Sequence, residues 1–295
     1  MSPFLKSRHR WLYGMLAGVT ACSLSVATPQ PSQAGLLDLI FRGIQIIQLS
    51  NMSDSQEVKL GKQINKQITR QVPVSRNEEL NAYINELGQN LALTSSRPPD
   101  KDFEYTIQVV EDDSINAFAT MGGFVYIHTG LIEAAENEAE LVSVISHEIA
   151  HVAASHALNQ MKDVAIQQGI LSAAGLDNSQ AVQIGVQLAL NLPNSREDEE
   201  EADLLGLENM MKAGYDPIGA VTFMQTLQSL GGSSTPEILS THPHTANRVK
   251  KLEEYRLEKL KMYQQEQGVA YQGKGLDSAA YKNKIKSLGL EPRKK

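Results

Sequence analysis

The chain has 295 residues, of which 41% are hydrophobic and 21% are charged, and its formal net charge is −7 at pH 7. These values are typical of a globular protein with one large domain or two small ones and enough apolar material for a core. No long stripe of lysine and arginine is present, so charge and composition argue against a nucleic-acid partner.

The first 34 residues have the pattern of a signal peptide. A basic start is followed by an uncharged apolar run over residues 11–27, and small residues precede a cleavage point after Ala34. We therefore predict export, with an uncleaved membrane anchor as one alternative and a lipid anchor on Cys22 as the other. Cys22 is the only cysteine. Cleavage would leave no thiol, so any metal site must consist of histidines and carboxylates.

Apolar residues at helical spacing predict that most of the chain is helical. The predicted helices cover residues 35–49, 53–71, 77–93, 137–158, 160–192 with an interruption at 175–178, a segment from Ser195, a segment from Asp216, and 245–266. The first of these is expected to pack on the domain, with contact to a membrane surface as the alternative. Asp54 or Ser55 is available to cap the second, and Ser195 with Asp198 has the form of a capping box.

The hydrophobic period changes between these helices. Residues 103–110 alternate as a strand does, and residues 124–128 form a second short strand after two glycines. Residues 267–295, which are rich in lysine and glycine, are predicted to be a loosely ordered tail. The order of helices, small sheet and helices predicts an α+β fold, with one domain over residues 35–266.

The sequence His147-Glu148-Ile149-Ala150-His151 matches HExxH. Residues four apart lie on one face of a helix, about 6 Å apart at Cβ, so the two imidazoles can bind one Zn²⁺. Glu148 lies one residue further round, where it can act as a general base without binding the metal. An accidental match in a chain with 7 histidines is the alternative.

A catalytic zinc needs a third protein ligand. Residues 195–203 carry a run of acidic side chains, and Glu199 and Asp203 are four residues apart, so both can face the HExxH helix. One of them can bind zinc while the other accepts the Nδ1–H of a ligand histidine. The spacing does not decide which residue has which role, and a solvated acidic helix start is the alternative.

Together, HEIAH, the pattern Ser195-Arg196-x-x-Glu199-x-x-Ala202-Asp203 and Thr241-His242-Pro243 resemble the zinc metallopeptidase family that includes the CAAX prenyl protease, HtpX, Oma and BepA-type enzymes. The stretch 116–132 also resembles the exported members, in which it forms the strand and turn beside the catalytic helix. The resemblance spans residues 54–255 and implies a mainly helical gluzincin-type domain with a small sheet. No apolar run of about 18 residues follows position 34, which favours the branch without membrane helices. The helical-repeat extension of BepA-type proteins is not expected.

The resemblance also implies roles for single residues. Glu199 would be the third zinc ligand and Asp203 the residue that contacts a ligand histidine. His242 would be a displaceable fourth ligand that keeps the enzyme latent, although by itself this segment also reads as a surface turn with His242 and His244. Arg248 stands where the family carries an arginine, which would pair with a glutamate or steady an oxyanion; a surface cation is the alternative.

Two further histidines are predicted to be structural. His156 follows His151 by five residues, at a place where relatives carry a histidine. In a continuous helix it would lie about 140° round from His151, so it is not expected to reach the zinc. His128 ends a strand and is expected to be a packing or surface residue.

The predicted function is a periplasmic zinc-dependent endopeptidase with one Zn²⁺ per chain. Its expected partners are misfolded or unassembled envelope polypeptides, with association with a membrane surface as an additional expectation. Glu148 would be the general base, and the substrate would add as a strand near residues 123–128. The alternatives are a latent protease that acts mainly as a chaperone or assembly factor for outer-membrane proteins, and a structural zinc-binding module.

Overall fold

The computed structural model describes residues 49, 52–167, 178–230, 236–243 and 246–293. The predicted signal peptide, nearly all of the predicted helix 35–49, and His244 lie outside these residues. No helix in the described part is long and apolar enough to cross a membrane.

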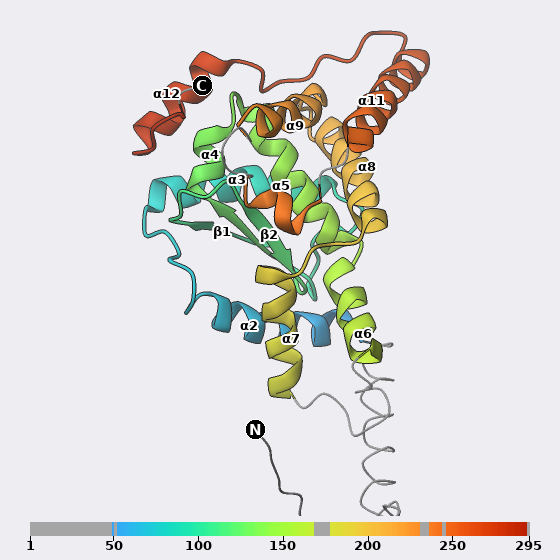
Figure 1. The fold of residues 1–295 in the computed structure, drawn as a ribbon. Coiled ribbons are helices and arrows are strands. Elements are labelled where there is room, and N and C mark those ends of the chain that lie inside the picture. The colour runs from blue at the N-terminus through green and yellow to red at the C-terminus, as the bar shows by residue number, and fades with distance from the viewer. Residues whose placement is uncertain (1–48, 50–51, 168–177, 231–235, 244–245, 294–295) are drawn as a thin grey trace, which may run out of the picture.

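The described elements follow one another as a helical pair, a small sheet and a series of helices (Figure 1). In chain order they are α2 (Asp54–Ile68), α3 (Glu78–Thr94), β1 (Thr106–Val110), β2 (Ala117–Thr120), β3 (Phe124–His128), α4 (Thr129–Ala134), α5 (Glu138–Ala153), α6 (His156–Gln167), α7 (Asn178–Asn191), α8 (Arg196–Lys212), α9 (Ile218–Leu230), α10 (Ile238–Thr241), α11 (Ala246–Gln267) and α12 (Ser278–Ser287). The predicted α+β class is confirmed.

The sheet has the strand order β1-β3-β2, with β1 parallel and β2 antiparallel to β3. A tight turn joins β2 to β3, and both Gly122 (φ 77°) and Gly123 (φ 91°) have the left-handed backbone that glycine adopts most easily. Because β3 is the central strand, the expectation that a substrate adds beside residues 123–128 is wrong. Pairing with β2, a strand that the residue pattern alone did not predict, leaves β3 no free edge.

The two faces of the sheet pack into different parts of the core, as the alternation of strand side chains requires. On β3, Val125 and Ile127 belong to the cluster that includes buried residues of α3 and α5. Phe124 and Tyr126 point the other way, into a cluster with buried residues of α2, α6 and α7. Helix α5 also contacts α8 and α9, so it is enclosed on most sides. This burial explains why α5 is apolar around most of its circumference.

Several predicted boundaries shift. The cap of α2 is Ser53, whose side chain accepts from the backbone of Gln56, rather than Asp54 or Ser55. The predicted helix 137–158 is two helices, because Ser155 has φ 57° and ends α5. Ser195 caps α8 as predicted, with its hydroxyl accepting from the Asp198 backbone.

The prediction of a loosely ordered tail is wrong for residues 278–287. Helix α12 buries Tyr281 and Ile285, and the Tyr281 hydroxyl donates to the Ile132 carbonyl. The segment before α12 accepts a hydrogen bond through Gly275 O from the backbone of Ala139 in the first turn of α5. The C-terminal segment therefore packs against the beginning of α5.

We predict that Ile285→Ala lowers the free energy of unfolding by about 2–5 kcal/mol, because it leaves a cavity at a fully buried site. Urea unfolding followed by circular dichroism measures the loss. Lys286→Ala, on the exposed side of the same helix, is the control and should change stability by less than about 0.5 kcal/mol. Equal, small effects of both substitutions would show that α12 does not pack on the core.

Candidate metal centre

Helix α5 presents the HExxH residues from a rigid, buried position. His151 and Glu148 are buried, and the neighbouring Ile145 and Ile149 are fully covered. The two histidines face the same side, with their Nε2 atoms 3.0 Å apart. The predicted helical spacing therefore gives the expected pair of converging imidazoles.

Helix α8 crosses α5 at close range and brings Glu199 to the two histidines. The approach depends on Gly206, where a Cβ atom would lie 3.2 Å from the His147 backbone nitrogen. The Ser146 hydroxyl donates to the Gly206 carbonyl at 2.8 Å and joins the two helices. Because Glu199 and Asp203 are one turn apart on α8, both reach the HExxH face, so the alternative of a solvated acidic turn is wrong for these two residues.

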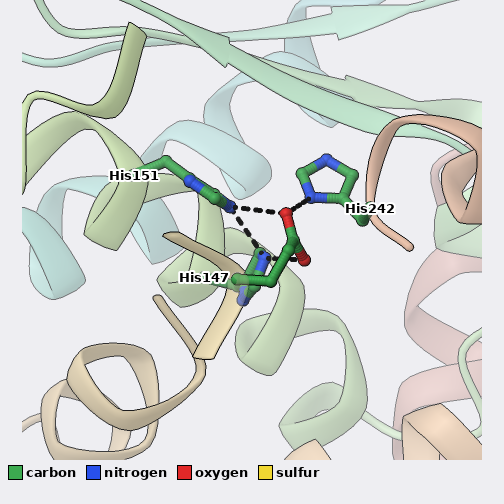
Figure 2. Close-up of side chains that lie close together, drawn as sticks. His147, His151 and His242 are labelled. Atoms are coloured by element: carbon green, nitrogen blue, oxygen red, sulfur yellow. Dashed lines mark hydrogen bonds and ion pairs between the residues drawn. The ribbon is translucent and has the colours of Figure 1, made fainter. Parts of the chain in front are cut away.

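The donor atoms have the spacing of a metal site. Glu199 Oε1 lies 3.3 Å from His151 Nε2, and Glu199 Oε2 lies 3.4 Å from His147 Nε2. One donor atom from each of His147, His151, Glu199 and His242 lies within 4.8 Å of all the others, and Figure 2 shows the three labelled histidine rings close together. Ligands about 2.0–2.1 Å from a tetrahedral zinc are about 3.4 Å apart, so these residues fit that ion.

His242 completes the cluster from the C-terminal end of α10. Its Nδ1 lies 2.9 Å from Glu199 Oε1, and its Nε2 lies 3.5 Å from Glu148 Oε1. The side chain is buried, so the alternative of an ordinary surface turn is wrong for His242. The Asn194 backbone donates to the Thr241 carbonyl at 2.9 Å, which ties this segment to the loop before α8.

Arg248 and Asp203 form the second layer of the site. Asp203 Oδ1 lies 3.2 Å from His147 Nδ1, the contact expected for a residue that orients a ligand histidine. Arg248 donates to both oxygens of Asp203 at 2.8 Å and lies 2.8 Å from Glu199 Oε2. Arg248 is only 3% exposed, so it is not a surface cation. Its guanidinium pairs with carboxylates instead of facing the open side of the site.

Glu148 differs from the other acidic residues of the site. Neither of its carboxylate oxygens has a hydrogen-bond donor among the described residues, although the side chain is buried. Burial raises the pKa of Glu148, against the attraction of His242 and His147. A buried carboxylate with a raised pKa and free lone pairs is suited to accept and return a proton.

The pKa values of the other groups follow from burial and from pairing. Burial works to lower the pKa of His147, but the hydrogen bonds to Asp203 and Glu199 outweigh it and raise the value to about 10. His151 is dominated by burial, which lowers its pKa to about 3. Burial works to raise the pKa of Glu199, but the surrounding histidines lower it well below its usual value. Because metals bind neutral imidazole, protons and a divalent cation compete for His147.

Two residues near the cluster were not predicted to belong to the site. The Asn194 amide donates to Glu199 Oε1 at 2.8 Å and lies 3.3 Å from His242 Nδ1. Only its position next to the cap of α8 could have indicated this. His156 contacts His151, although it was predicted to be merely structural. His128 is buried and lies 2.8 Å from the Ser114 hydroxyl, as expected for a packing residue.

An HExxH helix, a glutamate from a following helix and a small adjacent sheet define a metallopeptidase centre. The sequence matches peptidase family M48 over residues 74–256. The chain belongs to this family, and the resemblance inferred from its motifs is confirmed.

Three relatives illustrate the similarity. The beta-barrel assembly-enhancing protease of Escherichia coli (strain K12) is 30% identical over 215 residues, which are 68% of this chain and 44% of the relative. The mitochondrial metalloendopeptidase OMA1 of Schizosaccharomyces pombe is 33% identical over 159 residues, 52% and 47% of the two chains. Metalloprotease YcaL of Escherichia coli (strain K12) is 33% identical over 152 residues, 49% and 58%. The chain thus spans less than half the length of the first relative, and these names fit a peptidase rather than a chaperone.

We predict that Arg248→Met lowers the free energy of unfolding of the metal-free protein by about 3–5 kcal/mol, because it removes the guanidinium that pairs with two buried carboxylates. Urea unfolding in the presence of a chelator measures the effect. The control is Arg256→Met on the same helix, which breaks only the partly exposed pair with Glu253 and should cost at most about 1 kcal/mol. Equal losses would show that the Arg248 network does not hold the site together.

Proposed function

We propose that the chain is a zinc-dependent endopeptidase, with one Zn²⁺ held by His147, His151 and Glu199. The observation that carries this proposal is the Glu148 carboxylate, which lies beside the ligand set, buried and without a hydrogen-bond donor among the described residues. A purely structural metal site has no use for such a group. Membership of peptidase family M48 supports the same reaction.

Different residues of the site have different roles in the proposed hydrolysis. Zinc in this site would act as a Lewis acid and lower the pKa of water. Glu148 takes a proton from the attacking water and returns it to the leaving amine, which its raised pKa favours. Asp203 holds the His147 ring through Nδ1, and Arg248 holds Asp203 and Glu199 in place. The site is therefore arranged before substrate arrives.

The substrate is proposed to run along the outer edge of β2. Residues 118–121 line a cavity together with Glu148, His151 and His242, so a chain paired with β2 would pass over the reacting groups. Backbone pairing accepts many sequences, which suits the cleavage of unfolded polypeptides. This replaces the predicted pairing beside residues 123–128.

A second cavity lies on the other side of His242 and is mainly apolar. It is lined by His147, Arg248 and His242 and by large apolar residues that include Leu207, Phe223 and Leu252. Its volume is about 50 Å³, so it can hold a small group. We expect it to receive an apolar side chain of the substrate next to the scissile bond.

The proposed substrates are misfolded or unassembled envelope proteins. The names of the bacterial relatives refer to beta-barrel assembly, which supports an envelope location. The predicted signal peptide over residues 1–34 supports export to the periplasm, with an anchor in this segment or on Cys22 as the alternative. Association with a membrane surface remains part of the same proposal.

His242 is proposed to hold the enzyme latent by taking the fourth ligand position. Its Nδ1 lies 2.9 Å from Glu199 Oε1, in the same cluster as the three proposed ligands, where it would compete with water and substrate. The segment is held by the Asn194–Thr241 backbone hydrogen bond and by the Arg248 guanidinium, which donates to the Pro243 carbonyl at 3.0 Å. Displacing His242 would open the position between the two cavities.

We predict that Glu148→Gln retains one zinc per chain and loses about 10²- to 10⁴-fold in cleavage rate, because the general base is absent. Zinc content by mass spectrometry and casein cleavage are measured on the same preparations, in a background in which His242 is replaced by alanine so that latency does not mask activity. Cleavage by Glu148→Gln at the rate of its parent would contradict the proposed mechanism.

We predict that His242→Ala cleaves casein about 10- to 100-fold faster than the wild-type chain, because the imidazole no longer has to be displaced from the fourth ligand position. We take the cost of that displacement to equal that of losing a hydrogen bond to a charged group, about 1.5–3 kcal/mol. Zinc content should stay at one per chain. The matched control is His128→Ala, another buried histidine that lies outside the cluster, and it should leave the rate unchanged. An unchanged or lower rate for zinc-loaded His242→Ala would contradict latency.

A further inference from the structure

A break in the HExxH helix places a third histidine behind the metal ligand His151. Helix α5 ends at Ala153, Ser155 adopts φ 57°, and α6 begins at His156. Had the helix continued, residue 156 would lie about 140° round from residue 151. The left-handed conformation of Ser155 instead changes the chain direction, so that the ring centroids of His151 and His156 are 4.9 Å apart and the ring planes form an angle of 71°.

The two imidazoles are joined by a buried hydrogen bond. Nδ1 of His151 lies 2.8 Å from Nδ1 of His156, and the His156 side chain is 3% exposed. On its far side, His156 Nε2 lies 3.4 Å from Glu201 Oε2 and 3.7 Å from Asp198 Oδ1. A chain of contacts therefore runs from the acidic start of α8 through His156 to His151.

The geometry allows one arrangement of protons in this chain when His151 binds a metal. Nε2 of His151 faces Glu199 and His147, so it supplies the lone pair to the metal and Nδ1 carries the hydrogen. Nδ1 of His156 must then accept this hydrogen, which leaves the hydrogen of His156 on Nε2. That nitrogen donates toward the carboxylates of Glu201 and Asp198. Every nitrogen in the chain thus has a partner of the right kind.

We propose that His156 is a positioning residue for the zinc ligand His151, acting as the hydrogen-bond acceptor that fixes its tautomer and ring orientation. The proposal rests on the proposed zinc site. Ligand histidines usually donate to a carboxylate or a carbonyl oxygen, as His147 does to Asp203, and such partners raise the basicity of the ligand. His151 instead contacts the imidazole of His156, and it is His156 that contacts the carboxylates of Glu201 and Asp198.

The break between α5 and α6, which positions His156, is also stabilised by Arg97, a residue distant in the sequence. Arg97 Nη1 lies 3.4 Å from the Ser155 hydroxyl. The same guanidinium lies 2.9 Å from Glu57 Oε2 and 2.6 Å from Asp54 Oδ1 in α2. These contacts attach the strained residue to a separate element of the core, so the position of His156 does not depend on α5 and α6 alone.

The test compares three variants of the full chain. His156→Leu replaces the imidazole, and with it the acceptor, by an apolar side chain of similar size. His156→Asn restores an acceptor, because the amide oxygen is as many bonds from Cβ as Nδ1 is. His128→Leu is the matched control, a histidine of similar burial that is bonded to Ser114 away from the cluster. Zinc affinity is measured by competition with a chromogenic chelator, and Co²⁺ absorption reports the ligand geometry.

We expect His156→Leu to bind zinc about 10- to 100-fold more weakly and to shift the Co²⁺ spectrum. His156→Asn should lie within a few-fold of the wild type, and His128→Leu should match it. Wild-type affinity in His156→Leu would overturn the proposal, and so would equal losses in His156→Leu and His156→Asn, which would indicate packing alone. Thermal melting of the metal-free variants identifies any that fail to fold, in which case His156→Asn decides the question.

This experiment is independent of catalysis. If the wild-type chain binds zinc but does not cleave casein, the proposed function fails while the role of His156 is still measured by affinity and spectrum. If the variants bind zinc as the wild type does and cleavage proceeds, the proposed function stands and the role of His156 is rejected.

Discussion

The burial of the Glu199 carboxylate is the constraint on which the rest of the site depends. An anion that is 0% exposed is costly unless cations and donors surround it. Arg248, His147, His151 and His242 all lie within 3.4 Å of its oxygens. The same charge that needs these partners makes the carboxylate a strong ligand for a divalent cation, so the structural and the chemical requirements coincide.

The fold supplies this constraint through a few close contacts. Gly206 lets α8 approach α5, the Ser146–Gly206 hydrogen bond joins the two helices, and the Ser195 cap sets where α8 begins. Helix α5 also contacts β2 and β3 of the sheet, and residues of β2 line a cavity together with Glu148. Each proposed zinc ligand and the proposed general base therefore come from packed helices. The proposed substrate path follows a strand edge, where backbone pairing can accept different sequences.

Much of the site was predictable because its signals are local. The spacing of His147 and His151 places both rings on one helix face, and the cap at Ser195 marks the start of α8. The spacing alone did not decide between Glu199 and Asp203, and the family resemblance was needed for that choice. Arg248 is buried against Asp203, 45 positions away, and Asn194 contacts His242, 48 positions away, and no local pattern encodes either contact.

The errors in the sequence-based predictions also have physical causes. Ser155 carries a left-handed backbone that glycine or asparagine would have indicated, so the break in the helix and the contact between His156 and His151 were missed. The strand β2 has four residues, too few for a clear alternation. In α12, only Tyr281, Ile285 and the following Leu288 are buried, and this sparse pattern in a lysine-rich segment looked like a tail.

We propose that Glu199 is the ligand around which the site is built. The most direct test is the zinc content and zinc affinity of Glu199→Gln, which keeps the size and shape of the side chain but removes its charge, with circular dichroism to show that the chain is folded. We predict one zinc per wild-type chain and a folded variant that loses the metal on dialysis against a weak chelator. Retention of one zinc with unchanged affinity in Glu199→Gln would show that the Glu199 carboxylate does not hold the metal.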